Sequence, residues 1–183
     1  ANTRHPMSVL TFETTSRVIY EFDGALQWGR LWNEFGAKRA ILITGPGRQK
    51  AGLIDAPYQA LIDDGIDTLL WTRVEADPPE RTILDAVKGA MDFAADIIIG
   101  LGGGSSMDTA KLVALLCGNP QQLDAIYGIG LAKGPRLPLI QVPTTAGTGS
   151  EVTPISIVTT PTQEKRALYR RFFIRMSHCL MPN

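Results

Sequence analysis

The strongest fold signal in the sequence is Asp96-Ile-Ile-Ile-Gly-Leu-Gly-Gly-Gly-Ser-Ser-Met-Asp-Thr-Ala-Lys111. It opens with a near-continuous apolar run, which is typical of a strand covered on both faces of a parallel sheet. A glycine turn follows, and the pattern then becomes that of a helix. The order strand, glycine turn, helix predicts part of a βαβ unit with a ligand-binding turn at the carboxyl end of the strand.

The glycine turn is chemically suited to a phosphate group. Gly102, Gly103 and Gly104 have no side chains to block an approaching phosphate, and their N–H groups can converge on its oxygens. Ser105 and Ser106 add hydroxyl donors, and we expect them to cap the following helix. The same glycines also suit a turn needed only for tight packing of strand on helix. Because the turn matches neither GxGxxG nor a GxxxxGK[ST] P-loop, the spacing indicates a phosphate without saying which one.

Two charged residues follow in the first two turns of the predicted helix. Asp108 would repel a phosphate if it faced the ligand, so we interpret it as a structural carboxylate of the cofactor-binding loop that accepts loop N–H groups. Lys111 is expected to face either the ligand or solvent.

Apolar strands alternate with amphipathic stretches outward from this motif. Strands are predicted at residues 17–22, 40–44, 68–71, 96–101 and 138–142, and helices at 26–35, 53–64 and 80–94. The strand at 40–44 is expected to run into a loop at Gly45-Pro46-Gly47. This alternation with short connections predicts an α/β fold with a doubly wound, mostly parallel sheet and a ligand site at the carboxyl ends of its strands.

Composition favours a small-molecule partner. The 183 residues are 44% hydrophobic and 20% charged, which suits one globular domain or one and a fraction. Eighteen basic residues balance eighteen acidic ones, so no overall field attracts nucleic acid or an acidic membrane. Residues 1–17 hold no signal-like apolar run, and we expect no membrane segment and a cytoplasmic location. Cys117 is expected to be a buried, reduced thiol that forms no disulfide with Cys179.

A second polar loop follows the predicted strand at 138–142. Gln141-Val-Pro-Thr-Thr-Ala-Gly-Thr-Gly-Ser-Glu-Val-Thr-Pro154 is dense in hydroxyl side chains and could hydrogen-bond ribose and pyrophosphate without adding charge. The alternative is a polar surface connection.

Together the two loops resemble the iron-type, group III alcohol dehydrogenase family, in which GGGSxxDxAK and PTTxGTGSE(V/A)T recur in this order and at this separation. The resemblance extends over residues 8–163 and implies a Rossmann-like NAD(P)-binding domain at residues 1–163. It places the pyrophosphate at residues 102–106 and implies that three threonines line the adenosine and ribose side, with Ser150 and Glu151 as loop supports. These threonines are Thr144, Thr145 and Thr148.

The residue directly after the second predicted strand bears on the choice between NAD and NADP. Many NAD-using members of the family resemble one another in having Asp directly after the second strand, where its carboxylate binds the ribose and repels a 2′-phosphate. This chain has Gly45 there, so the repulsive group is missing. We therefore favour NADP over NAD, with Arg48 or Lys50 as the partner of the phosphate.

The metal-binding part of the family has no counterpart in this sequence. The resemblance implies hydride transfer between an alcohol or aldehyde and the nicotinamide, with a divalent metal, iron or zinc, held by one Asp and three His of a helical C-terminal domain. Only His5 and His178 occur here, and neither matches a ligand position. We expect no metal ligands, no catalytic residues and little or no turnover. Full-length relatives often dimerise through the first domain, which makes a homodimer one expectation.

Residues 164–183 do not resemble the family and show no recognisable period. Permitted codons for residues 166–183, read from the third base of the first codon, give Arg-Val-Val-Ser-Pro-Phe-Phe-Tyr-Pro-Asp-Val-Ala-Leu-Leu-Asp-Ala-Lys, which looks like the family's usual continuation. We interpret this as a frameshift near Lys165, in the gene or in the sequence record. Coding DNA with codons incompatible with the second frame would contradict it.

Three interpretations of the function stay open at this point. The first is the nucleotide-binding half of a dehydrogenase, inactive alone. The second is a nucleotide- or phosphate-binding module without catalysis, and the third is a remnant of a disrupted gene.

Overall fold

The computed structural model describes residues 18–20, 24–27, 34–145, 147–150, 152–153, 155–169 and 177–179. Its main sheet has six strands in the order β1-β9-β6-β4-β2-β3, and every neighbouring pair is parallel. The strands are β1 (Val18–Tyr20), β2 (Arg39–Ile43), β3 (Asp67–Trp71), β4 (Ile97–Gly102), β6 (Leu139–Pro143) and β9 (Ser177–Cys179). The predicted α/β class with a mostly parallel sheet is confirmed.

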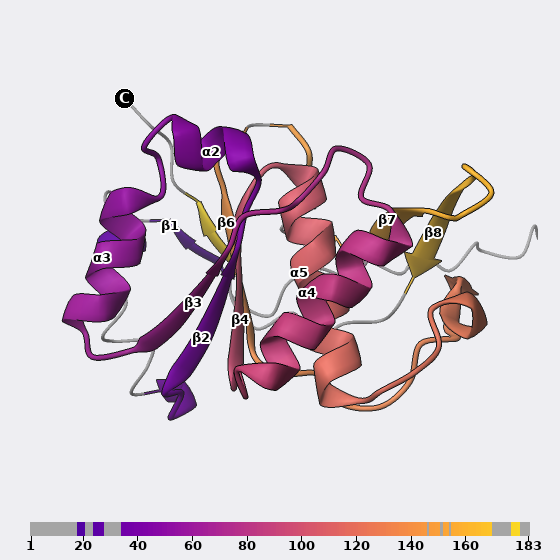
Figure 1. The fold of residues 1–183 in the computed structure, drawn as a ribbon, viewed down its shortest axis with the longest axis horizontal. Helices are drawn as coiled ribbons and strands as arrows, with labels where there is room; N and C mark the ends of the chain where they lie inside the picture. The colour runs from indigo at the N-terminus through magenta and orange to yellow at the C-terminus, as the bar shows by residue number, and fades with distance from the viewer. Residues whose placement is uncertain are drawn as a thin grey trace, which may run out of the picture.

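Helices cover both faces of the sheet, as Figure 1 shows. One face carries α2 (Pro46–Lys50) and α3 (Asp55–Asp63), and the other carries α4 (Glu80–Asp92) and α5 (Gly104–Gly118). The described residues also include two short 3₁₀ helices, η1 (Gly24–Leu26) and η2 (Asp124–Ile126). The chain leaves β2 towards one face and β4 towards the other, although the two strands are neighbours. This is the switch point at which doubly wound sheets bind ligands.

Alternation of side chains along the central strands builds two cores. In β2, Ile41 and Ile43 belong to the core under α4 and α5, whereas Leu42 belongs to the core that includes Leu61 of α3. All six residues of β4 are buried. Continuous apolar runs therefore form the central strands because both of their faces are covered.

A second, three-stranded sheet has the order β5-β8-β7. Its strands are β5 (Gly128–Ile129), β7 (Ile155–Thr159) and β8 (Lys165–Tyr169). In β7, Ser156 and Val158 are buried while Ile155 and Ile157 are exposed, the alternation of a half-covered strand. The antiparallel hairpin of β7 and β8 was not predicted from the sequence, because β7 lies beyond the hydroxyl-rich loop and β8 lies in the stretch without a recognisable period.

Most predicted elements appear within one or two residues of the expected bounds. The prediction of a loop at Gly45-Pro46-Gly47 is wrong in part, since Pro46 begins α2. Proline at the first helical position is favourable, because its fixed φ suits the helix and its missing N–H would have no partner there. Of the helix predicted at 26–35, residues 28–33 lie outside the described residues. Leu26 ends η1, and residues 34–35 are helical.

Two further expectations concern the membrane and the cysteines. No helix among the described residues is both long and apolar enough to cross a bilayer. Cys117 is a free thiol, half-buried rather than buried, and desolvation raises the pKa of this thiol to about 11. The side chain of Cys179 lies outside the described residues.

Candidate functional site

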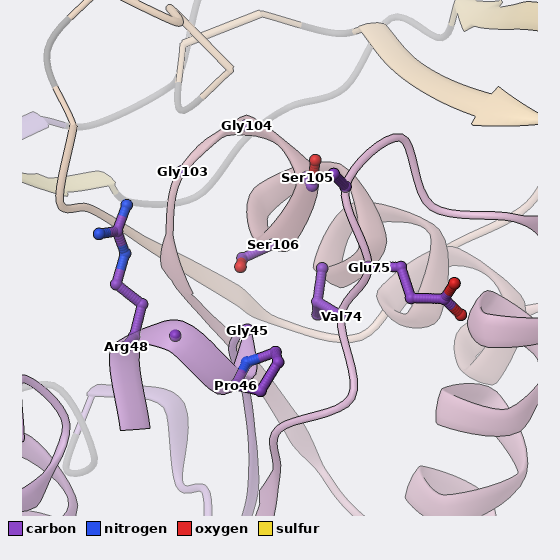
Figure 2. A pocket seen from close by; sticks show the side chains of 11 residues that line it. Gly45, Pro46, Arg48, Val74, Glu75, Gly103, Gly104, Ser105 and Ser106 are labelled. Carbon is purple, nitrogen blue, oxygen red and sulfur yellow. The ribbon is translucent and has the colours of Figure 1, made fainter. Parts of the chain in front are cut away.

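A pocket of about 290 Å³ lies at the carboxyl ends of β2, β3 and β4, where the switch point occurs. Figure 2 shows it from close by. It is lined by Gly45, Pro46, Gly47, Arg48, Val74, Glu75, Ala76, Gly103, Gly104, Ser105 and Ser106. The glycine turn after β4 and the segment after β2 therefore share one pocket, as the topology predicts.

Close approaches shape the glycine turn, and the backbone of Gly102 requires glycine. Gly102 has a φ of +147°, and a Cβ there would lie 2.7 Å from Ser106 Oγ. Gly103 has an ordinary φ of −87°, yet a Cβ would lie 3.3 Å from Thr145 Oγ1. The turn therefore presents bare backbone to the pocket, as a phosphate cradle requires.

The hydroxyl-rich loop lies directly against this turn. The Thr144 N–H donates to the Gly102 carbonyl over 2.9 Å. A Cβ on Gly104 would lie 3.4 Å from Ser150 Oγ and 3.7 Å from Thr148 Cβ. The Oγ1 of Thr144 is buried without a hydrogen-bond partner among the described residues. The two loops are thus brought together, although Glu151, expected to support the second, lies outside the described residues.

The prediction that Ser105 and Ser106 cap α5 is wrong. The N-cap is Gly103, no side chain makes a capping hydrogen bond, and both serines lie inside the first turn. The serines nevertheless line the pocket. N–H groups in a first helical turn have no intrahelical acceptor, so they are available to an anion in the pocket.

Asp108 and Lys111 point to a different element. Asp108 Oδ2 accepts the N–H of Ile157 on β7 over 3.1 Å, which supports the interpretation as a structural carboxylate; Asp108 does not line the pocket. Lys111 is 1% exposed, and its Nζ donates to the Ile155 carbonyl over 2.7 Å. The expectation that Lys111 faces ligand or solvent is therefore wrong, because the helix turns this side chain into the packing against β7.

Opposite charges line the pocket, but they point in different directions. Figure 2 shows Arg48 extending from α2 and the Glu75 carboxylate pointing away from the glycine turn. Glu75 accepts hydrogen bonds from Thr82 Oγ1 at 2.6 Å and from Arg81 Nη2 at 2.9 Å. The Thr82 bond, and after it the Arg81 guanidinium, lower the pKa of Glu75. Arg48 Nη2 lies 3.9 Å from the position of a Cβ on Gly103, so this cation is beside the turn.

The pocket residues that follow β3 were not predicted from the sequence. Val74, Glu75 and Ala76 line the pocket because β3 ends at the same sheet edge as β2 and β4. That edge was predictable, but no motif marks these residues. Thr44, also missed, is fully buried, and its Oγ1 has no partner among the described residues. Lys50 is not among the residues that line the pocket.

A metal site does not fit the described part of the chain. No group of three or more His, Cys, Asp or Glu residues there is arranged to hold a metal ion. His5 lies outside the described residues, and only the backbone of His178 is described. The expectation of no metal ligands stays a prediction.

Comparison with known proteins places the chain in one family. The family model of iron-containing alcohol dehydrogenase matches residues 15–177. Sulfoacetaldehyde reductase of Bilophila wadsworthia is 40% identical over 79% of this chain and 38% of its own length. Long-chain-alcohol dehydrogenase 1 of Geobacillus thermodenitrificans is 35% identical over 81% of this chain and 40% of its own length. The chain thus spans about two fifths of these relatives.

Solved structures support the same family assignment. A 1,3-propanediol oxidoreductase superposes with a TM-score of 0.88 at 26% identity, covering 94% of this chain and 46% of that protein. An iron-containing alcohol dehydrogenase of Thermotoga maritima superposes with a TM-score of 0.81 at 33% identity, covering 94% and 48%. The glycine turn, the hydroxyl-rich loop beside it and these matches together show that the chain belongs to the iron-containing alcohol dehydrogenase family.

Proposed function

We propose that this chain binds NAD(P) in the pocket at the switch point, as the nucleotide-binding part of an iron-type alcohol dehydrogenase. The observation that carries the proposal is the bare backbone of Gly103 and Gly104, where a side chain would close the gap to Thr145, Thr148 and Ser150. The pyrophosphate would lie on residues 102–106. Thr144, Thr145 and Thr148 would bond the ribose side.

The chemistry would be shared between cofactor and protein. When bound, the nicotinamide supplies the centre that accepts or donates a hydride. The residues of this chain bind and orient the dinucleotide through N–H groups and neutral hydroxyls. Since the described residues hold no group of three or more His, Cys, Asp or Glu arranged for a metal ion, no step through a metal is derived for them. We infer that it turns over no alcohol or aldehyde alone, and turnover of an added primary alcohol would contradict this.

We further propose a preference for NADP. Gly45 leaves no carboxylate at the end of β2, and Arg48 lies beside the glycine turn within the pocket. A guanidinium binds phosphate through directed hydrogen bonds. Lys50 serves as a matched comparison because it lies on the same helix and does not line the pocket.

Calorimetric titration of the purified chain with NADPH and NADH tests both proposals. We expect saturable binding with NADPH favoured about tenfold, which is about 1.4 kcal/mol. Gly45→Asp should reverse the order, Arg48→Ala should abolish the difference, and Lys50→Ala should keep it. Equal affinities in every variant would contradict the NADP preference. No heat with either nucleotide, from a chain folded by circular dichroism, would contradict NAD(P) binding.

Three expectations about the whole protein also remain proposals. These are a homodimer, a cytoplasmic location and the frameshift near Lys165. Light scattering of the purified chain decides the first, since a monomer at micromolar concentration would contradict it.

A further inference from the structure

A buried ion pair joins two residues that the pocket does not use. Lys111 Nζ lies 3.2 Å from Asp108 Oδ1, and the two side chains are 1% and 10% exposed. Burying a charged pair carries a desolvation cost that its attraction does not always recover. Stability alone is therefore a weak explanation, and the remaining contacts of the pair show what it holds.

Both residues bind the backbone of β7. Lys111 Nζ donates to the Ile155 carbonyl over 2.7 Å, and Asp108 Oδ2 accepts the Ile157 N–H over 3.1 Å. β7 is the edge strand of the small sheet, with β8 as its strand neighbour. On the side of β7 away from β8, Thr159 donates its N–H to the Pro78 carbonyl. The ion pair supplies a further donor and acceptor to the same side, as a neighbouring strand would.

The other end of the hydroxyl-rich loop is attached to the same unit. Gln141 Nε2 on β6 donates to the Met107 carbonyl of α5 over 3.0 Å. The Thr144 N–H donates to the Gly102 carbonyl at the end of β4. The loop therefore begins and ends on partners in β4 and α5, the unit that carries the glycine turn.

We propose that Asp108 and Lys111 are positioning residues for the dinucleotide site. Acting through the backbone of β7, they hold the loop that contains Thr145 and Thr148 at its distance from Gly103 and Gly104. The inference rests on the proposed function, since the loop is taken to bind the dinucleotide. Neither residue lines the pocket.

The test compares the wild type with the double variant Asp108→Ala/Lys111→Met, which removes both bonds to β7 without leaving one buried charge alone. The single variant Lys111→Met removes the bond to Ile155 and also leaves the buried Asp108 carboxylate without its ion-pair partner. Lys88→Met is the control, because Lys88 and Asp92 form an exposed ion pair on α4. NADPH affinity is measured by calorimetry for each protein, and again in a Thr145→Val/Thr148→Val background. Circular dichroism checks folding.

We expect the double variant to bind NADPH about tenfold more weakly, and Lys88→Met to stay within about twofold of the wild type. In the Thr145→Val/Thr148→Val background the double variant should lose less than about twofold, because the hydroxyls of Thr145 and Thr148 that it misplaces are already gone. Unchanged affinity in the double variant would overturn the proposal. The same tenfold loss in both backgrounds would also overturn it, because that is the behaviour of general destabilisation.

Hydrogen exchange of the Ile157 amide, without nucleotide, gives a second readout. The wild type should protect this amide at least about tenfold more than the double variant, and equal exchange rates would overturn the proposal that the ion pair holds β7. If the wild type binds neither NADPH nor NADH, the proposed function fails, while the exchange rates still decide whether the ion pair holds β7.

Discussion

The glycine turn between β4 and α5 and the hydroxyl-rich loop between β6 and β7 lie side by side, but different forces shape them. Gly102 at φ +147° and the bond from the Met107 N–H to the Gly103 carbonyl fix the turn within a few residues. The loop instead depends on partners 44 and 49 residues away, Lys111 and Asp108. A local motif therefore encodes the turn, whereas the fold as a whole places the loop.

This difference predicts large effects for substitutions in the turn or in the strand beneath it. Each such substitution should change mainly one quantity, either the free energy of unfolding or the affinity for NADPH. Substitutions in the loop should act weakly, because several neutral hydroxyls share its role. Three variants test the comparison.

The largest effect is expected from Gly100→Val, in the strand beneath the turn. A Cβ on Gly100 would lie 2.4 Å from Gln141 Oε1 and 2.7 Å from Ala110 Cβ, so β4 and α5 would have to separate. We expect a loss of about 3 kcal/mol in the free energy of unfolding, measured by urea denaturation. The control is Gly47→Ala on α2, where a Cβ meets nothing within 4 Å. Wild-type stability in Gly100→Val would show that this packing is not what holds the turn.

Gly103→Val should separate binding from folding. The φ of −87° at Gly103 suits any residue, so we expect a stability loss of only about 1 kcal/mol, from a poorer N-cap. The side chain would fill the space beside Thr145, and NADPH affinity should fall at least about 100-fold, or about 2.7 kcal/mol. Calorimetry and urea denaturation measure the two quantities. A variant that loses stability but binds normally would favour a turn built only for packing.

The central strands and the meeting of the two loops were predictable because each depends on a local pattern. Apolar runs predicted β2, β4 and β6, and parallel strands bring their carboxyl ends to the same edge of the sheet. The position of the Lys111 side chain was not predictable, since a lysine on a helix gives no sign that a carbonyl on a later strand will accept its hydrogen bond. Glu75 was missed for a similar reason: β3 ends at the pocket, but no motif marks that position.

The contrast between β4 and β9 bears on the proposed frameshift. β4 fills its place in the parallel sheet with six buried residues, whereas β9, between β1 and β6, consists of Ser177, His178 and Cys179. Inner strands of parallel sheets are normally apolar. The second reading gives Val-Ala-Leu across these codons, a run that is apolar throughout. This match supports the proposal that the tail is read out of frame.

The smallest effect is expected from Thr145→Val, in the loop. The substitution keeps the shape of the side chain and removes one hydroxyl beside Gly103. One neutral hydrogen bond contributes about 0.5–1.5 kcal/mol, and neighbouring hydroxyls can take over part of its role, so NADPH affinity should fall about threefold. Thr162→Val in the exposed β7–β8 turn should leave the affinity unchanged, because Thr162 lies in a different part of the chain from the pocket. A loss as large as that of Gly103→Val would show that Thr145, and not the glycine backbone, is the main contact of the nucleotide. The order of the two regions would then be reversed, with the loop binding the cofactor and the turn only supporting it.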